Sequence, residues 1–155
     1  MTNYYFDTSA LLKGYVNEEG SGWVRSLVNA SDQLIFISAV TTVEVACAFA
    51  RRYREGVLSP EAYEQVWQAF SYDSQQKYYQ VRIAKRVLEA ASRLARQQPL
   101  RAYDAIQLGT AWIMTERLKK HEESPITFVA ADRRLLQIAE DIGFSVMNAS
   151  EHDVS

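Results

Sequence analysis

Residues 4–9 of this chain, Tyr-Tyr-Phe-Asp-Thr-Ser, decide the fold that we expect. Three aromatic side chains form a strand-like run that ends on the carboxylate of Asp7 and two hydroxyl groups. Apolar side chains at helical spacing follow at residues 10–16. A buried strand that leads directly into a helix is typical of α/β folds, in which ligands bind outside the carboxyl ends of the strands. The sequence therefore places Asp7 where a functional site is expected.

Strand and helix patterns alternate along the rest of the chain. Short apolar runs predict further strands at residues 34–37, 77–81, 126–129 and 144–146. Helical periodicity lies between them, at residues 23–28, 39–55, 60–70, 83–98, 102–118 and 133–139. The hydroxyl of Ser59 before Pro60 indicates a capped helix start. This alternation predicts a three-layer α/β/α fold with a central, mostly parallel β-sheet.

Helical spacing also predicts which side chains face the core. For the helix at residues 39–55 the predicted inner face carries Val40, Val43, Cys47 and Ala50. Cys47 is interpreted as a small core residue rather than a reactive thiol. For the helix at residues 83–98 the predicted inner face carries Val87, Leu88, Ala91, Leu94 and Ala95. A stripe of Tyr63, Val66, Trp67 and Phe70 indicates core or helix-hairpin packing, with a surface for a partner or a second copy of the chain as the alternative.

The bulk properties are those of one globular domain. The 155 residues are 48% hydrophobic and 23% charged, and the net charge is -2. Proteins that bind nucleic acid through bulk charge are usually basic, so an RNA or DNA partner requires a local patch or metal ions. A single cysteine, no room for a signal peptide before the first strand, and no membrane-spanning run predict a cytoplasmic protein. We expect one domain at residues 1–147 and a frayed tail at residues 148–155.

Four acidic residues could carry chemistry. Asp7 and Asp132 each follow a strand pattern and precede a helix, Asp104 opens a buried helix, and Glu44 lies in the first turns of another. Each has a structural explanation: the aspartates can cap helices, and Glu44 matches a capping box with Thr41. Sequence alone leaves these explanations open.

The four carboxylates could form a cation-binding site if they lie close together in the fold. Should strand order reverse beside the first strand, the strands before Asp7 and Asp132 are neighbours, and Glu44 and Asp104 can flank the crevice. Two like charges about 5 Å apart repel by roughly 3 kcal/mol at an effective dielectric of 20. Such a cluster either binds protons or binds a cation. Carboxylates without histidine or cysteine favour Mg²⁺ or Mn²⁺ over Zn²⁺.

Four stretches in register resemble the PIN-domain ribonucleases, and within them the VapC-type toxins of toxin–antitoxin pairs. They are residues 6–11 (Phe-Asp-Thr-Ser-Ala-Leu), 43–45 (Val-Glu-Val), 103–108 (Tyr-Asp-Ala-Ile-Gln-Leu) and 129–135 (Val-Ala-Ala-Asp-Arg-Arg-Leu). The resemblance implies Mg²⁺- or Mn²⁺-dependent cleavage of RNA, an antitoxin partner and a homodimer.

The resemblance also implies roles for individual residues. Asp7, Asp104 and Asp132 would hold metal, Glu44 would position the attacking water, and Ser9 would support Asp7. The chain departs from the family at Ala130, where a hydroxyl residue is common, and this puts the second metal position or the water network in question. Among the basic residues, Arg133 follows Asp132 directly and is the candidate RNA contact.

Two other functions fit the same residues. The first is a catalytically weak or inactive PIN-like domain that binds RNA or protein without cutting it. The second is a phosphotransferase or phosphate receiver with Asp7 as nucleophile. The segment after Asp7 lacks the second aspartate, two residues on, that one major phosphatase class uses.

Overall fold

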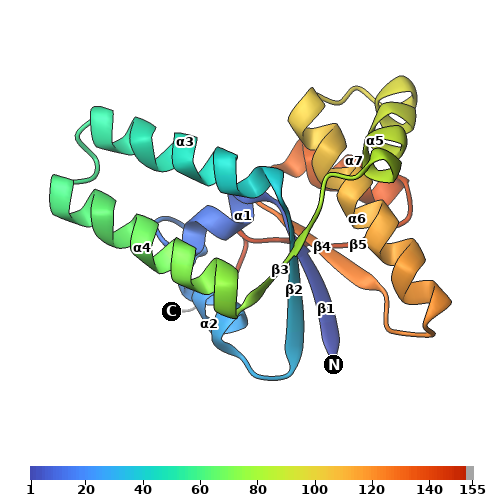
Figure 1. Ribbon diagram of the computed structural model, residues 1–155, viewed down its shortest axis with the longest axis horizontal. Helices are drawn as coiled ribbons and strands as arrows, with labels where there is room; N and C mark the ends of the chain where they lie inside the picture. Colours follow the sequence, from blue (N-terminus) through green and yellow to red (C-terminus); the bar gives the residue numbers. More distant parts are fainter. Residues whose placement is uncertain (153–155) are drawn as a thin grey trace.

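The computed structural model describes residues 1–152 of the chain. Its centre is a five-stranded sheet of parallel strands in the order β3-β2-β1-β4-β5 (Figure 1). The strands are β1 (Thr2–Phe6), β2 (Gln33–Ser38), β3 (Tyr78–Val81), β4 (Ile126–Ala130) and β5 (Ser145–Asn148). From β1 the chain moves outwards through β2 to β3, and then crosses back to β4 and β5 on the other side of β1. The strand order therefore reverses between β1 and β4, so the strands before Asp7 and Asp132 are neighbours.

Helices cover both faces of this sheet. They are α1 (Thr8–Leu11), the 3-10 helix η1 (Leu12–Gly14), α2 (Ser21–Asn29), α3 (Val40–Arg54), α4 (Pro60–Gln76), α5 (Lys85–Gln97), α6 (Ala102–Lys120) and α7 (Arg133–Asp141). Helices α1 to α4 pack on one face and α5 to α7 on the other (Figure 1). This arrangement confirms the predicted three-layer α/β/α fold. Among the described residues, no helix has the length and apolar character needed to cross a membrane.

Strands β1, β2 and β4 are buried on both faces, which explains why their sequences are apolar rather than alternating. Tyr5 and Phe128 belong to the core under α6 and α7, and their rings stack with centroids 5.5 Å apart. Phe6 and Val129, the next residue of each strand, belong to the core under α1 to α4. The sheet therefore lies between two separate hydrophobic cores, one on each face.

Helix α3 buries a different face from the one predicted. Its buried residues are Thr41, Val45 and Phe49, whereas Val43 is 62% exposed and Cys47 is exposed. The interpretation of Cys47 as a core residue is therefore wrong. Apolar residues recur at helical spacing on two faces of this helix. The face that is buried includes the polar Thr41, whose hydroxyl group is hydrogen-bonded inside the protein.

Helix α5 shows a smaller difference from the prediction. Val87, Ala91 and Leu94 are buried as expected, but Leu88 is 46% exposed and Ala95 is exposed. Helix α5 packs mainly against α6, so only a narrow strip of its surface is covered. The apolar arc of the sequence is wider than this strip.

The aromatic stripe of α4 packs against neighbouring aromatic rings. Phe70 is 1% exposed and lies against the rings of Trp67 and Tyr15, with centroids 5.9 and 5.6 Å away. The rings of Tyr63 and Tyr53 of α3 pack with their centroids 4.7 Å apart. Helices α3 and α4 run side by side away from the sheet (Figure 1). Core packing is therefore confirmed for Phe70, whereas Tyr63, Val66 and Trp67 are only half-buried and leave the alternative of a partner surface open.

Regular structure continues beyond residue 147, where we expected a frayed tail to begin. Asn148 is the last residue of β5, and Ala149 is fully buried and donates its N–H to the carbonyl oxygen of Ala130 at 2.8 Å. The ring of His152 stacks on Trp23 with centroids 4.3 Å apart. Residues 148–152 are therefore part of the fold, and residues 153–155 of the expected tail lie outside the described residues.

Gly20 permits this docking of the C-terminal segment. Its φ is +89°, and an added Cβ would lie 1.9 Å from the carbonyl oxygen of Ala149. Gly20→Ala should lower the free energy of unfolding by on the order of 3 kcal/mol, because left-handed strain of about 1–2 kcal/mol adds to overpacking of about 1–3 kcal/mol. Urea denaturation measures the loss.

Gly56→Ala is the matched control for this substitution. Gly56 has a φ of +77°, but no heavy atom lies within 4 Å of an added Cβ. This variant should lose only the strain, about 1–2 kcal/mol. Equal losses for the two variants would contradict the close packing of Gly20 on Ala149.

Candidate functional site

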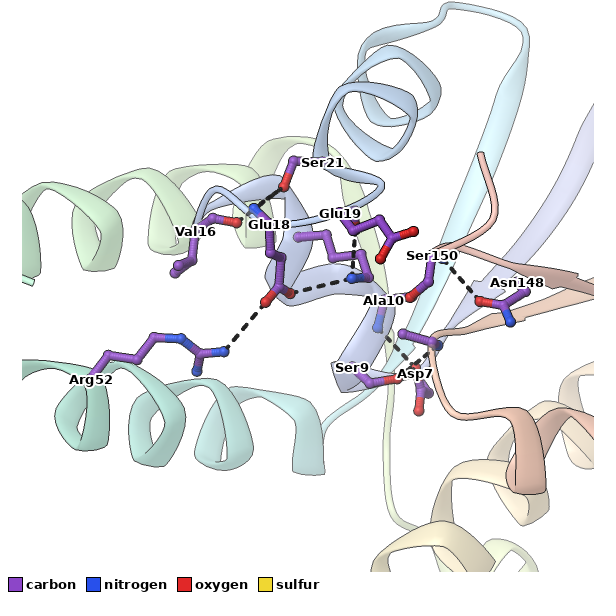
Figure 2. Close-up of polar contacts among 12 residues, drawn as sticks. Asp7, Ser9, Ala10, Val16, Glu18, Glu19, Ser21, Arg52, Asn148 and Ser150 are labelled. Atoms are coloured by element: carbon purple, nitrogen blue, oxygen red, sulfur yellow. Dashed lines mark hydrogen bonds and ion pairs between the residues drawn. The ribbon is translucent and has the colours of Figure 1, made fainter. Parts of the chain in front are cut away.

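Two of the predicted site residues lie at the ends of adjacent strands. Asp7 follows β1 and Asp132 follows β4, and these two strands are hydrogen-bonded neighbours. Asp7 is 5% exposed and is the N-cap of α1. Its Oδ1 accepts hydrogen bonds from Ser9 Oγ at 2.7 Å and from the backbone N–H of Ala10 at 3.1 Å (Figure 2). Among the described residues no hydrogen bond reaches Oδ2, so the cap leaves one carboxylate oxygen available.

Asp132 shows the same pattern at the end of β4. It is the N-cap of α7, and its Oδ1 accepts hydrogen bonds from the backbone N–H groups of Arg134 and Leu135 at 2.9 and 3.2 Å. Ser9 joins the two strand ends, because its Oγ also accepts a hydrogen bond from the backbone N–H of Ala131 at 3.0 Å. Capping is therefore a correct interpretation of both aspartates, although each cap uses only one oxygen.

The other two acidic residues do not cap helices. The N-caps of α3 and α6 are Ala39 and Arg101, and neither makes a side-chain capping hydrogen bond. The capping interpretations of Glu44 and Asp104 are therefore wrong. Glu44 lies in the second turn of α3 and Asp104 in the first turn of α6. Helix capping does not account for either carboxylate.

A buried polar network holds Glu44. Its Oε1 accepts hydrogen bonds from Thr8 Oγ1 at 3.0 Å and from Gln107 Nε2 at 2.8 Å. Gln107 is 2% exposed, and its Oε1 accepts a hydrogen bond from the hydroxyl of Tyr5 at 2.7 Å. Sequence reasoning assigned no role to Gln107. The signal was present, since Gln107 is a polar residue inside an otherwise apolar stretch of a buried helix.

Burial and neighbouring charge both act on Asp7. Burial is the largest effect and raises the pKa of Asp7 from 3.8 to about 7. Hydrogen bonds from Ser9 and Ala10 oppose this rise in pKa, and the charges of Glu44 and Asp104 add to it. A buried carboxylate with two acidic neighbours, and with no ion pair to any residue from 1 to 152, is poorly suited to a purely structural role.

The pKa of Asp104 is also raised, first by burial and then by the charge of Asp132. The guanidinium groups of Arg101 and Arg134 oppose this rise. Repulsion therefore links the acidic residues as a chain of neighbours: Glu44, Asp7, Asp104 and Asp132.

Asp104 and Asp132 line a cleft of about 240 Å³. Arg101 and Arg134 line the same cleft, and Arg134 Nη2 donates a hydrogen bond to the carbonyl oxygen of Pro99 at 2.8 Å. Two larger depressions, of about 630 and 640 Å³, lie on α5 and between α3 and α4 and contain none of the four carboxylates. The small acidic cleft is therefore the one that the chemistry favours.

The convergence of the four carboxylates is incomplete. Among residues 1–152, no three acidic, histidine or cysteine side chains lie close enough together to hold a metal ion. The expectation that all four share one pocket is not met in this arrangement, because Asp104 and Asp132 line the cleft while Asp7 and Glu44 do not. The donor set nevertheless fits Mg²⁺ or Mn²⁺, since it consists of hard carboxylate oxygens whose mutual repulsion a cation would relieve.

The two arginines that follow Asp132 lie in different surroundings. Arg133 is highly exposed, lines a different depression beside β5, and pairs with Glu151 at 3.6 Å. Arg134 lines the acidic cleft. Arg133 therefore does not line the cleft, although it follows Asp132 directly in sequence. Arg134 does line the cleft.

Comparison with known proteins gives the class of this fold. The family model of the PIN domain matches residues 4–141, and the chain therefore belongs to the PIN domain family, whose members are generally nucleases. No curated protein matches the sequence.

Three solved structures illustrate the similarity of fold. The structure of VapBC2 from Rickettsia felis bound to a promoter DNA fragment has 12% sequence identity and a TM-score of 0.63, over 95% of this chain and 98% of that chain. FitAcB from Neisseria gonorrhoeae has 15% identity and a TM-score of 0.56, over 94% and 97% of the two chains. FitAB bound to the IR36 DNA fragment has 15% identity and a TM-score of 0.61, over 97% and 98%. At these identities the similarity shows the fold.

Proposed function

We propose that this protein is a Mg²⁺- or Mn²⁺-dependent ribonuclease that hydrolyses RNA phosphodiester bonds and acts as the toxin of a toxin–antitoxin pair. The observation that carries the proposal is the environment of Asp7. A carboxylate that is 5% exposed, with its pKa raised to about 7, lies at the end of β1 beside two further acidic groups. A divalent cation would offset the repulsion between these carboxylates.

Asp7, Asp104 and Asp132 are the residues that would hold the ion. When bound, a divalent ion supplies charge stabilisation for the scissile phosphate and lowers the pKa of water. Ser9 keeps one oxygen of Asp7 engaged and leaves the other for the ion. Glu44, whose Oε1 is fixed by Thr8 and Gln107, orients the attacking water.

Arginine side chains supply the contact with RNA phosphates in this proposal. Arg133 is the contact proposed from sequence, and Arg134 lies in the cleft itself. Arg134→Ala should raise KM for RNA by about 10-fold, because a charge-assisted hydrogen bond contributes about 1.5–3 kcal/mol. Steady-state kinetics on a short labelled RNA measure KM.

Arg133→Ala is the neighbouring control. Its ion pair with Glu151 is exposed, so its loss should change stability little, and KM reports any RNA contact. A larger KM effect at Arg133 than at Arg134 would place the RNA beside β5 rather than over the acidic cleft.

Cleavage by the purified protein tests the proposed activity. The protein should cut single-stranded or structured RNA in Mg²⁺ or Mn²⁺, and EDTA should stop the reaction. Mapping the ends of the fragments identifies the cleavage site. RNA that remains intact under all these conditions would exclude the nuclease.

A second function, binding without cleavage, is favoured by two observations. No three potential metal ligands lie together among the described residues, and Ala130 is fully buried with no hydroxyl to offer. A binding module would retain RNA on a gel in the presence of EDTA and leave it uncut in Mg²⁺. These two readouts separate the alternatives.

The proposed toxin has a protein antitoxin and forms a homodimer. The resemblance to the VapC-type toxins supports both proposals, and the solved neighbours VapBC2 and FitAB, described as bound to DNA fragments, share the fold. The depression between α3 and α4, lined by Tyr53, Tyr63 and Trp67, is the proposed contact surface. Light scattering distinguishes the 17.7 kDa monomer from a dimer of twice that mass.

A further inference from the structure

Gln107 occupies the centre of the buried polar network beside the acidic site. Its amide group lies within hydrogen-bonding distance of four side chains that come from other elements, β1, α1 and α3, and its two N–H bonds are shared among three of them. The partners are Tyr5 OH at 2.7 Å, Thr8 Oγ1 at 3.2 Å, Thr41 Oγ1 at 3.0 Å and Glu44 Oε1 at 2.8 Å. A buried amide with this many partners is costly to leave unpaired.

The partners determine which way the amide points. A phenol hydroxyl can donate to the amide oxygen, and Tyr5 does so from a fully buried position. The opposite orientation would set the amide oxygen against the carboxylate oxygen of Glu44, and two acceptors cannot share a hydrogen bond. The carboxylate of Glu44, which can only accept, therefore draws the NH₂ group of Gln107, and Tyr5 donates to the amide oxygen on the other side.

Glu44 receives both available donors on the same oxygen. Gln107 Nε2 and Thr8 Oγ1 donate to Oε1, and among the described residues no hydrogen bond reaches Oε2. Hydrogen bonds of this kind fix the rotation of a carboxylate and leave the second oxygen free. The carboxylate of Glu44 is therefore held in one orientation from behind.

We propose that Gln107 is a positioning residue that holds the Glu44 carboxylate in the orientation needed for phosphodiester cleavage. The inference rests on the proposed ribonuclease function and extends it to a residue that touches neither substrate nor metal. Residues that orient a catalytic group from behind typically contribute about 10- to 100-fold to activity. Thr8 shares the task, and Tyr5 fixes the amide.

Gln107→Met removes the donors at nearly constant side-chain volume. We expect kcat for RNA cleavage to fall by about 10- to 100-fold and KM to stay within about 2-fold, because the RNA contacts are unchanged. Gln33→Met is the control. Gln33 is the first residue of β2, at the end of the strands opposite the site. Its side-chain amide donates to the carbonyl oxygens of Leu27 and Ala30. This control should keep kcat.

The exchanged pair Glu44→Gln/Gln107→Glu separates positioning from simple stabilisation. The single variant Gln107→Glu sets two carboxylates against each other and should lower the melting temperature. The double variant restores one donor and one acceptor between the two positions, so the melting temperature should recover. Activity should not recover, because the carboxylate is now at position 107. Recovery of activity with stability would overturn the inference.

A measurement on the wild-type protein covers the case in which Gln107→Met does not fold. The side-chain amide protons of Gln107 should exchange with solvent at least about 10-fold more slowly than those of the exposed Gln68. Equal exchange rates would overturn the inference, because the amide would then not be held.

The outcomes also distinguish this inference from the function on which it rests. A wild-type protein that cuts no RNA in Mg²⁺ or Mn²⁺ contradicts the proposed ribonuclease. A wild-type protein that cuts RNA, alongside a folded Gln107→Met with unchanged kcat, contradicts only the role of Gln107.

Discussion

Asp7→Asn should reduce metal-dependent RNA cleavage by on the order of 10³-fold, since even residues that merely support a metal ligand contribute 10- to 100-fold. The fold should survive, because the amide oxygen of asparagine can accept the same hydrogen bonds from Ser9 and Ala10. What is lost is the negative charge and the second oxygen. Single-turnover cleavage of a labelled RNA at saturating Mg²⁺ measures the loss.

Asp32→Asn is the control for this substitution. Asp32 is exposed and lies just before β2, at the end of the strands opposite the site. It should leave the cleavage rate unchanged. An Asp7→Asn protein that is folded and cuts RNA at the wild-type rate would remove Asp7 from the active site.

The second large effect concerns stability without metal. The folded-state pKa of Asp7 is about 7 against 3.8 for an ordinary aspartate, so folding favours the protonated form. The stabilisation from this proton is fully present below about pH 4 and is lost as the pH rises through 7. One pKa unit corresponds to about 1.4 kcal/mol, so ionisation costs the folded state on the order of 4 kcal/mol.

Comparison of the wild type with Asp7→Asn isolates this contribution. In EDTA, the variant should gain stability over the wild type between pH 4 and pH 8, up to several kcal/mol by urea denaturation. Asp104→Asn should act in the same direction at pH 8, because it removes a carboxylate that burial and Asp132 destabilise in its charged form. A pH-independent difference between wild type and Asp7→Asn would show that Asp7 is an ordinary helix cap.

Added Mg²⁺ should reverse the loss in the wild type at pH 8. A ligand present at 100 times its dissociation constant stabilises the folded state by about 2.7 kcal/mol, which corresponds to a rise in melting temperature of roughly 5–10 °C for a domain of this size. The same addition should have little effect on Asp7→Asn.

Much of the fold could be predicted from the sequence. Strands buried on both faces appear as unbroken apolar runs, and Ser59 with Pro60 marks the start of α4 by local chemistry alone. These features depend on nearest neighbours in sequence, which one chain displays. The pairing of β1 with β4 was a condition in the sequence argument, and only the resemblance to the PIN-domain family implied it.

The details that failed depend on packing. The buried face of α3 includes Thr41 and leaves Cys47 exposed, because the core there is closed by hydrogen bonds rather than by apolar contact alone. Gln107 could not be assigned a partner, since Tyr5, Thr8 and Glu44 come from distant parts of the sequence. Nor could adjacency to Asp132 show that Arg134, and not Arg133, lines the cleft.

The proposed function requires the carboxylates to lie closer together when a cation is bound. Their order along the strands and helices fits a single site, while the described residues bring no three potential ligands together. A cation has to draw Asp7, Asp104 and Asp132 towards one point for the proposed function to hold. Side chains at the ends of strands and helices can make this movement by rotation, without a change of fold.

Anomalous diffraction from crystals grown with MnCl₂ tests this convergence most directly. We predict a Mn²⁺ peak beyond the carboxyl ends of β1 and β4. Oxygens of Asp7 and of at least one of Asp104 and Asp132 should lie within about 2.0–2.3 Å of the ion. Crystals of Asp7→Asn should lack the peak. A wild-type structure with no Mn²⁺ at that edge, and with the carboxylates as far apart as they are without metal, would contradict the account.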